Sequence, residues 1–129
     1  AEELIQEFLD VDVLVLGVPM YNLGIPSTLK SWIDHISVAG RTFEYTANGP
    51  RGLAGDKQVY ILSTRGGVYG DNSPMDHQIS YLKTIFGFLG ISEIHTIQAE
   101  GLNISPENRE QGIAAAHAQI QETLGTAVA

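Results

Sequence analysis

The chain has 129 residues, of which 43% are hydrophobic and 17% charged, and seven Lys and Arg against fifteen Asp and Glu give a formal net charge of −8. These values are typical of one globular domain that buries a hydrophobic core. So few basic residues make a nucleic acid or an anionic membrane surface an unexpected partner, and the apolar runs are far shorter than the about 20 residues of a membrane span. The absence of cysteine excludes disulfides, cysteine-ligated metals and a cysteine nucleophile, and it fits a cytoplasmic location.

The first residues carry apolar side chains at helical spacing, so we expect a helix with one apolar face at the start of the chain. The residues of this face are Leu4, Ile5, Phe8 and Leu9. Neither a Met nor an N-cap residue precedes them, which favours a chain that is part of a longer sequence. A nearly continuous β-branched run follows over residues 11–19, and such a run is typical of a strand buried on both faces.

A second helical pattern begins at Ser27, with apolar side chains at i, i+3, i+4 and i+7, and Gly40 is expected to end it. Residues 41–55 are rich in Gly, Asn and Pro, and they predict a loop or a short hairpin. Residues 58–63 form another β-branched and apolar run. They predict a second buried strand.

A capping pattern precedes the third helix. Ser73 and Asp76 have the spacing of a capping box, with Pro74 at the first helical position, so we expect this helix to begin at Pro74 and to run to Gly90. Its apolar face comprises Ile79, Leu82, Phe86 and Leu89. Residues 93–98 predict a third strand.

Ser105 is expected to cap the last helix. The residues of this helix that we expect to face inward are Ile113, Ala116, Ile120 and Leu124. Strands that alternate with helices predict an α/β domain with a parallel sheet and helices on both faces, and ligands of such sheets bind beyond the carboxyl ends of the strands. Two loops therefore matter most, residues 19–25 and residues 64–72.

Motifs for several other activities are missing from the sequence. No G-x-G-x-x-G segment follows a predicted strand, and no glycine-rich loop has Walker spacing with Lys57, so neither a nicotinamide Rossmann site nor an NTPase is expected. Ser27-x-x-Lys30 lacks the partner motifs of a β-lactamase-like nucleophile, and we interpret it as a helix start. The four histidines are scattered without ligand spacing, so no metal site is expected.

The loop at residues 19–25 is unusual because it places apolar side chains at the mouth of the sheet. These side chains belong to Met20, Tyr21, Leu23 and Ile25. A flat conjugated ring is a suitable partner, since it needs an apolar wall, an aromatic neighbour and a few backbone amides for its polar edge. The alternative is that these side chains pack on the following helix.

The loop after the second strand begins with Thr64, Arg65 and a pair of glycines. Gly66 and Gly67 permit a ligand to approach the backbone closely and to meet its N–H groups. The two loops at neighbouring strand ends would form one wall of a binding site. Arg65 could place a positive charge near a reduced, anionic ring, or it could form a surface ion pair.

Four segments carry a further pattern. They are Pro19-Met20-Tyr21-Asn22, Phe43-x-Tyr45-Thr46-x-Asn48-Gly49-Pro50-x-Gly52-Leu53, Arg65-Gly66-Gly67 and Phe86-Gly87-Phe88-Leu89-Gly90. In this order they resemble the FMN-dependent NADH azoreductases, also described as NADH:quinone oxidoreductases. The resemblance implies a flavodoxin-like fold, a doubly wound parallel sheet in three αβα layers with strand order 2-1-3-4-5. Residues 1–129 would then be the C-terminal two-thirds of one such domain and would supply strands 3, 4 and 5.

By match to that family, one loop would line the flavin ring through side chains and main-chain amides. Its residues are Met20, Tyr21, Asn22 and Leu23. The other loop would hold the pyrimidine edge and central nitrogen of the ring. Its residues are Thr64, Arg65, Gly66 and Gly67. The family usually has Phe at position 23 and often Ser at position 64, and both replacements are compatible with ring contact.

Tyr45 and Phe88 resemble aromatic residues that shape the substrate pocket of the family, and Phe88 would reach across the interface of a homodimer. Their alternative role is ordinary core or interface packing. The family binds the FMN phosphate through a hydroxyl-rich loop after strand 1, and this sequence contains no such loop. Charge-assisted hydrogen bonds to the phosphate supply much of the affinity, so we expect the chain alone to retain FMN poorly and to be inactive.

The resemblance implies an FMN-dependent oxidoreductase that transfers electrons from NADH to quinones and azo compounds by a ping-pong mechanism. The flavin carries the chemistry, so no protein acid, base or nucleophile is nominated. Three alternatives remain. The first is a flavin-binding electron-transfer module without NADH turnover, and the second is an acyl-carrier-protein phosphodiesterase, for which the sequence shows neither metal ligands nor an activated nucleophile. The third is an interaction domain, whose first strand would be an unprotected apolar edge that pairs with another chain.

Overall fold

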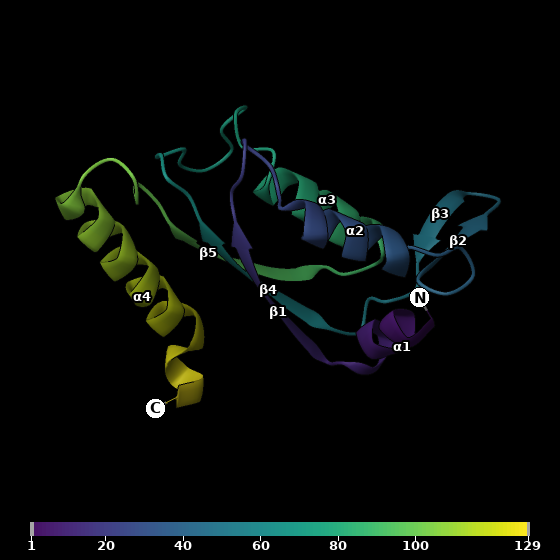
Figure 1. Ribbon diagram of the computed structural model, residues 1–129. Helices are drawn as coiled ribbons and strands as arrows, with labels where there is room; N and C mark the ends of the chain where they lie inside the picture. The colour runs from purple at the N-terminus through teal and green to yellow at the C-terminus, as the bar shows by residue number, and fades with distance from the viewer. Residues whose placement is uncertain (1, 129) are drawn as a thin grey trace.

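The computed structural model describes residues 2–128 of the chain, with side chains up to residue 125. Its centre is a three-stranded parallel sheet in the order β1 (Val13–Pro19), β4 (Gln58–Thr64) and β5 (Glu93–Ala99) (Figure 1). The register aligns the carboxyl ends of all three strands, since Pro19 lies opposite Thr64 and Thr64 lies opposite Ala99. The loops that follow the strands therefore lie along one edge of the sheet.

Helices cover both faces of this sheet. The helices α2 (Ser27–Ile36) and α3 (Ile79–Phe88) lie together on one face, and α4 (Pro106–Val128) lies on the other (Figure 1). The short helix α1 (Glu2–Asp10) packs against α2, where the Phe8 and Trp32 rings meet edge to face at 5.8 Å. This arrangement confirms the predicted fold class, a parallel α/β sheet between two helical layers.

The face under α2 and α3 holds the main hydrophobic core. Val59 and Ile61 of β4 point into it and are fully buried, as are Ile36, Leu82 and Phe86 from the two helices. The two residues of β4 are spaced by two because alternate side chains of a strand point to the same face. We call this side of the sheet the closed face.

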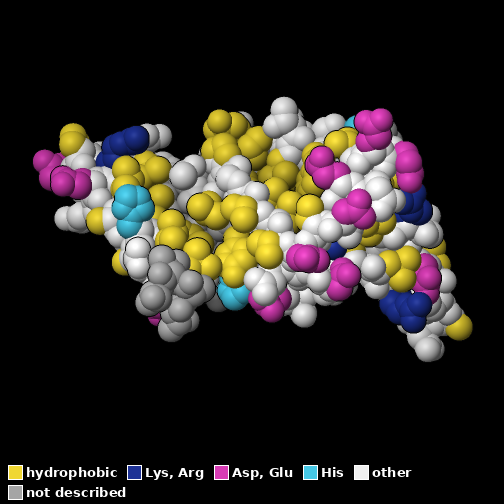
Figure 2. All heavy atoms as spheres, turned by 90° about the horizontal axis from the view of Figure 1, so that it is seen from below, with side chains coloured by type: hydrophobic (Ala, Val, Ile, Leu, Met, Phe, Trp, Pro, Cys, Tyr) yellow, Lys and Arg dark blue, Asp and Glu magenta, His cyan; other side chains and the backbone are white. Residues whose placement is uncertain are grey.

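The face under α4 is only partly covered, so the expectation that the first strand is buried on both faces is wrong. Val13 and Val15 of β1 are 50% and 61% exposed. They line an apolar groove of about 370 Å³ between the sheet and α4, to which Tyr60 and Ile120 also contribute. From below, hydrophobic side chains cover much of the middle of the molecule (Figure 2). We call this side the open face.

A two-stranded antiparallel hairpin, β2 (Phe43–Thr46) and β3 (Gly49–Gly52), projects beside the end of α3, and it confirms the expected short hairpin. The backbone of the hairpin packs directly against the backbone of the segment that follows α3, since a Cβ on Gly52 would come within 2.1 Å of the Gly90 nitrogen. The Ala54 N–H donates to the Leu89 carbonyl at 2.9 Å and continues this contact. Only glycine fits where two backbones come so close.

The third helix begins at Ile79, five residues later than the expected start at Pro74. The Ser73 hydroxyl accepts from the N–H of Met75 rather than from that of Asp76, and no helix follows there. Asp76 itself caps α3, because its Oδ1 accepts from the Gln78 and Ile79 N–H groups at 2.9 and 3.0 Å. The capping residue is thus the last member of the predicted motif instead of the first.

Two smaller differences concern the other helices. The helix α2 ends at Ile36, four residues before Gly40, because the Ser37 N–H and hydroxyl both donate to the Ile33 carbonyl and close the last turn. In α4, Ala116 is buried as expected, whereas Ile113 is 36% exposed. The predicted cap of α4 is confirmed, since the Ser105 hydroxyl accepts from the Asn108 N–H at 3.1 Å.

Candidate functional site

The two loops singled out in the sequence are neighbours at the carboxyl edge of the sheet. The Met20 N–H donates to the Thr64 carbonyl at 2.8 Å, which extends the β1–β4 pairing one residue beyond the strands. Residues 20–24 follow β1, and residues 65–72 follow β4. The structure therefore brings the expected ring-contacting segments together on one wall.

The first loop is a tight, strained turn. Tyr21 and Gly24 exchange both backbone hydrogen bonds, at 3.1 and 3.0 Å. Between them, Asn22 and Leu23 both have left-handed backbone angles, with φ of 51° and 69°. A left-handed conformation is costly for Leu, by about 1–2 kcal/mol, and such strain is often found at binding sites. The turn leaves the Tyr21 side chain 58% exposed.

The second loop directs a row of backbone N–H groups away from β5. The carbonyls of Arg65, Gly66 and Gly67 accept hydrogen bonds from the backbone N–H groups of residues 101–103, which follow β5. In a trans peptide the N–H points opposite to the carbonyl, so the N–H groups of residues 66–68 point away from that segment. Because β4 lies between β1 and β5, this is the side on which the loop after β1 lies. These are the donors that the polar edge of a flat ring requires.

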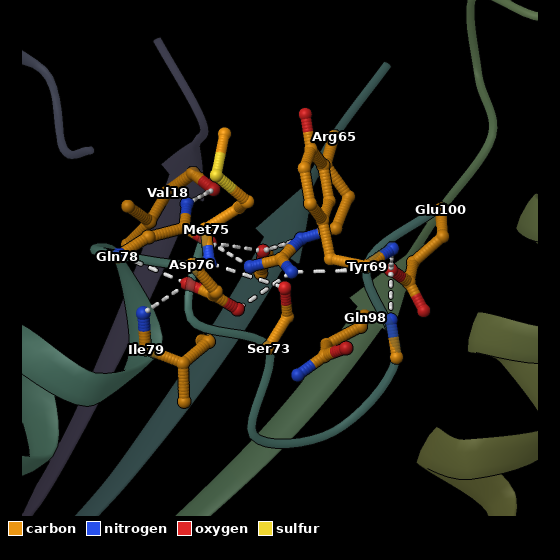
Figure 3. Close-up of polar contacts among 12 residues, drawn as sticks. Val18, Arg65, Tyr69, Ser73, Met75, Asp76, Gln78, Ile79, Gln98 and Glu100 are labelled. Carbon is orange, nitrogen blue, oxygen red and sulfur yellow. Dashed lines mark hydrogen bonds and ion pairs between the residues drawn. The ribbon is translucent and has the colours of Figure 1, made fainter. Parts of the chain in front are cut away.

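The Arg65 side chain is buried, with only 1% of the residue exposed. Its guanidinium donates to Asp76 Oδ2 at 2.7 Å, to the Ser63 hydroxyl at 3.2 Å and to the Gln78 side-chain oxygen. Figure 3 shows the guanidinium among these groups, with the Tyr69 ring beside it. The Arg65 Cζ lies 5.4 Å from the centroid of that ring. Of the two roles expected for this side chain, the ion pair is present, but it is internal rather than on the surface.

Two carboxylates surround this one cation. Glu100 Oε2 lies 3.9 Å from Arg65 Nη1, in addition to the Asp76 contact. Burial alone would raise the pKa of Asp76, but the hydrogen bonds from Arg65 and from the backbone N–H groups of Ile79 and Gln78 outweigh it and hold that pKa below its ordinary value. The cluster around Arg65 therefore carries no excess positive charge.

Tyr45 and Phe88 lie together, but away from the two loops. Both contact Phe43, with ring centroids at 5.4 and 4.9 Å, in a cluster formed by the hairpin and the last turn of α3. Tyr45 is 73% exposed and Phe88 38% exposed. The first turn of α3 adjoins the site, and the rise of the helix carries Phe88 about 13 Å further along.

Two cavities of the described chain are not lined by residues 20–24 or 64–67. One is the apolar groove on the open face, and the other is a polar cavity of about 330 Å³ lined by Asp76, Lys83 and the loop before α3. Among the described residues, no three His, Asp or Glu side chains gather as a metal site requires. Within residues 2–128, no helix combines the length and the apolar character needed to cross a membrane.

Sequence reasoning did not identify Asp76, Gln78 and Glu100 as neighbours of the site. Asp76 gave a signal, since its position in a capping motif indicates a helix start at this edge of the sheet. Gln78 and Glu100 gave none, because nothing in their local sequence distinguishes them from exposed polar residues.

Comparison with known protein families decides the relationship of the chain. Residues 1–124 match a protein family whose description is "Flavodoxin-like fold". The chain belongs to this flavodoxin-like family. The match confirms the resemblance in fold that the sequence motifs implied, and the β1-β4-β5 order agrees with three adjacent strands of a flavodoxin-like sheet.

The flavodoxin-like chain is also similar to curated proteins of known name. It is 55% identical over 120 residues to the FMN-dependent NADH:quinone oxidoreductase of Stenotrophomonas maltophilia, a match that covers 93% of this chain and 61% of the relative. It is 55% identical over 128 residues to FMN-dependent NADH:quinone oxidoreductase 1 of Xanthomonas euvesicatoria, a match that covers 99% of this chain and 66% of the relative. The chain thus spans less than two-thirds of the length of these relatives.

Solved structures give the same relationship. The azoreductase of Bacillus anthracis strain Sterne superposes with a TM-score of 0.83 at 37% identity, covering 92% of this chain and 58% of that protein. A second structure is an FMN-dependent NADH-azoreductase of Bacillus anthracis strain Ames Ancestor, solved in complex with FMN. It superposes with a TM-score of 0.79 at 29% identity, covering 93% of this chain and 60% of that protein.

Proposed function

We propose that the protein is an FMN-dependent oxidoreductase that transfers electrons from NADH to quinones and azo compounds. The observation that carries the proposal is the wall at the carboxyl edge of the sheet, where an exposed Tyr21 turn and a row of N–H groups lie side by side. The names of the relatives and of the superposed structures support the same activity. The absence of cysteine supports a cytoplasmic location for this reaction.

The residues present fit the ring of FMN. A planar ring would lie against the turn that contains Met20, Tyr21, Asn22 and Leu23, and the N–H groups of residues 66–68 would donate to its pyrimidine edge. Thr64 lies at the junction of the two loops, where its carbonyl accepts from the Met20 N–H, and the Arg65 N–H donates to the Ala99 carbonyl, so the N–H row begins at Gly66. The hydroxyl-rich loop that holds the phosphate in the family has no counterpart in this sequence, so the complete site requires residues beyond this chain.

When bound, FMN would supply the redox chemistry between NADH and the second substrate, and we propose that the two substrates react in turn, by a ping-pong mechanism. The part that this chain plays is to bind and orient. The N–H groups of residues 66–68 act as preorganised donors at the edge where negative charge develops on reduction. The exposed aromatic face of Tyr21 provides an apolar surface for a planar substrate.

We further propose that the functional form is a homodimer in which Tyr45 and Phe88 complete the substrate pocket of the partner. Both side chains are exposed and belong to one aromatic cluster, and exposed aromatic clusters are typical of interfaces. Within one chain, Phe88 lies about 13 Å along α3 from the turn that adjoins the two loops, and Tyr45 packs with it on Phe43, so neither is placed to share a pocket with the loops. A second copy is therefore the means by which they would reach a bound substrate.

The test uses the protein at its full encoded length. Protein reconstituted with FMN is expected to be yellow and to oxidise NADH in steady state with menadione or an azo dye as acceptor. Protein that stays colourless after FMN addition would overturn the proposal. Protein that binds FMN but does not turn over NADH would instead be an electron-transfer module.

A glycine variant tests the proposed position of the ring. A Cβ on Gly67 would meet only the Tyr69 side chain, at 3.3–3.4 Å, so Gly67→Ala is expected to fold normally. The added methyl group stands on the backbone that the ring should approach, and we expect about tenfold weaker FMN binding. Gly125→Ala is the control, because a Cβ there meets nothing within 4 Å. Equal FMN affinity in both variants would place the ring elsewhere.

A further inference from the structure

We propose that Arg65 is a positioning residue: through Asp76 and Gln78 it holds the two ring-binding loops at a fixed spacing, and its charge is not directed at the flavin. This inference rests on the proposed FMN site. It assigns to Asp76, Gln78 and Glu100 a role in that site although none of them would contact the ring.

The segment before α3 bridges the two loops. On the side of β1, the His77 N–H donates to the Leu23 carbonyl at 2.9 Å, and Gln78 Nε2 donates to the Val18 carbonyl at 2.9 Å. The first bond fixes the strained turn itself, and the second fixes the strand that leads into it. The position of the turn therefore depends on where residues 77 and 78 lie.

On the side of β4, the same segment is bound to Arg65. The side-chain oxygen of Gln78 accepts from the Ser63 hydroxyl at 2.6 Å and from the guanidinium, while Asp76 accepts from the guanidinium at 2.7 Å. Gln78 thus uses both ends of its amide, one for each loop. Figure 3 shows these groups converging from the ends of two strands and the start of α3.

Glu100 fixes the far end of the second loop. Its carboxylate accepts from the N–H groups of Tyr69 and Gly70, at 2.7 and 3.2 Å, and lies 3.9 Å from Arg65. The backbone around Gly66 and Gly67 is consequently held at Arg65 on one side and at Tyr69 on the other. Among the described residues, no buried side-chain nitrogen or oxygen in the structure lacks a partner. A fully satisfied buried network of this kind has one arrangement and is rigid.

The charges in this network argue against direct stabilisation of an anionic flavin by Arg65. One guanidinium lies between two carboxylates, and the three hydrogen bonds that it donates to Ser63, Asp76 and Gln78 are all internal. The carboxylates cancel most of the electric field of a cation paired in this way, so little of that field reaches groups outside the network. The N–H groups of residues 66–68 remain as the electrostatic contribution of this loop.

Asp76→Asn tests the proposal, because Asn keeps an oxygen that can cap α3 but loses the carboxylate that pairs with Arg65. In the full-length holoprotein we expect at least about tenfold weaker FMN binding and a two-electron midpoint potential that does not rise, since the N–H groups of residues 66–68 serve reduced flavin at least as much as oxidised flavin. Asp34→Asn is the matched control, because Asp34 forms an exposed ion pair with Lys30 at 2.8 Å. It should leave both quantities as in the wild type.

A role through charge predicts the opposite results. Freeing the guanidinium by Asp76→Asn would then favour the anionic reduced flavin, and a tenfold preference corresponds to a rise of about 30 mV for a two-electron couple. Arg65→Lys separates the two roles further, because Lys keeps the charge but not the planar fork of donors. We expect Arg65→Lys to lose FMN affinity as Asp76→Asn does. Wild-type affinity in either variant, or a potential raised by 30 mV or more, would overturn the proposal.

Hydrogen exchange measured without flavin decides the positioning independently of the proposed function. In Asp76→Asn, the amides of residues 21–24 and 66–70 should exchange faster together, while those of β4 remain protected. Unchanged exchange in both loops would contradict a positioning role even if the protein proved not to bind FMN. Failure of the wild-type protein to bind FMN would overturn only the proposed function and the flavin part of this inference.

Discussion

The two faces of the sheet differ although the same three strands make both. On the closed face, alternate residues of β4 such as Val59 and Ile61 have no exposed surface under α2 and α3. On the open face, Val13 and Val15 of β1 are mostly exposed, because α4 crosses over β5 and leaves β1 uncovered. The closed face therefore accounts for most of the hydrophobic stabilisation of this chain. The apolar side chains of the open face stay exposed when the chain folds, so folding alone does not explain why they are apolar.

The closed face also continues into the candidate site. Ser63 is the next residue of β4 to point to this side after Ile61, and it is where the hydrocarbon core gives way to the Arg65 network. The site is thus built on the rigid side of the sheet. A preorganised binding wall needs such support, because loops on a loosely packed scaffold do not hold donors in place.

The largest effect should come from a cavity on the closed face. Ile61→Ala is expected to lower the free energy of unfolding by about 2–5 kcal/mol, because the side chain is fully buried and its neighbours come from rigid helices. Urea unfolding followed by far-UV circular dichroism measures the change. A loss below about 1 kcal/mol would mean that this face is loosely packed, and the contrast between the faces would fail.

The next effect concerns acid stability at the edge of the closed face. The pKa of Asp76 is lowered in the folded state, so its contribution to stability is complete above its ordinary value of 3.8 and is lost as the pH falls through the folded pKa. Asp76→Asn should therefore destabilise the protein at pH 6 and differ progressively less from the wild type below pH 3.8. Unfolding at a series of pH values checks this. A constant difference across the range would show that the carboxylate does not titrate as described.

A glycine on the open face should have a small effect of opposite sign. A Cβ on Gly17 meets no atom within 4 Å, so Gly17→Ala introduces no clash and reduces the freedom of the unfolded chain. We expect a gain of about 0.5 kcal/mol in thermal or urea unfolding of this chain. Destabilisation would indicate that another surface packs closely on the open face in solution.

The smallest effect is expected for Val15→Ala, also on the open face. The side chain is 61% exposed, and the change in unfolding free energy should stay within about 0.5 kcal/mol. Ile61→Ala in the same experiment is the reference for a buried position. A loss as large as that of the reference would show that Val15 is covered in solution, and sedimentation would then reveal self-association.

Much of the fold could be predicted from local patterns. The β-branched runs indicated all three strands to within two residues, and the loop composition around Asn48 indicated the hairpin. The errors occurred where a tertiary contact outweighed a local one. The Ser73 motif predicted a helix start, but Asp76 is held by Arg65 in the folded chain, so α3 begins after it.

The site could be predicted in part. The exposed apolar turn and the glycine pair indicated the two loops, and parallel strand order was enough to place them side by side. The role of Arg65 was not accessible in the same way. A charged residue beside two glycines has the same sequence whether it faces a ligand or turns inward, and only its partners distinguish the two.

Periodicity, β-branching and turn residues act over a few positions, so the sequence alone determined the strands, the helices, their alternation and hence the parallel sheet with its loops at one edge. Which face of that sheet is closed, where α3 begins and where the Arg65 side chain points depend on residues 11 to 60 positions apart that meet only after folding. Burial of a charge requires partners at fixed distances, and those distances exist only in the tertiary structure.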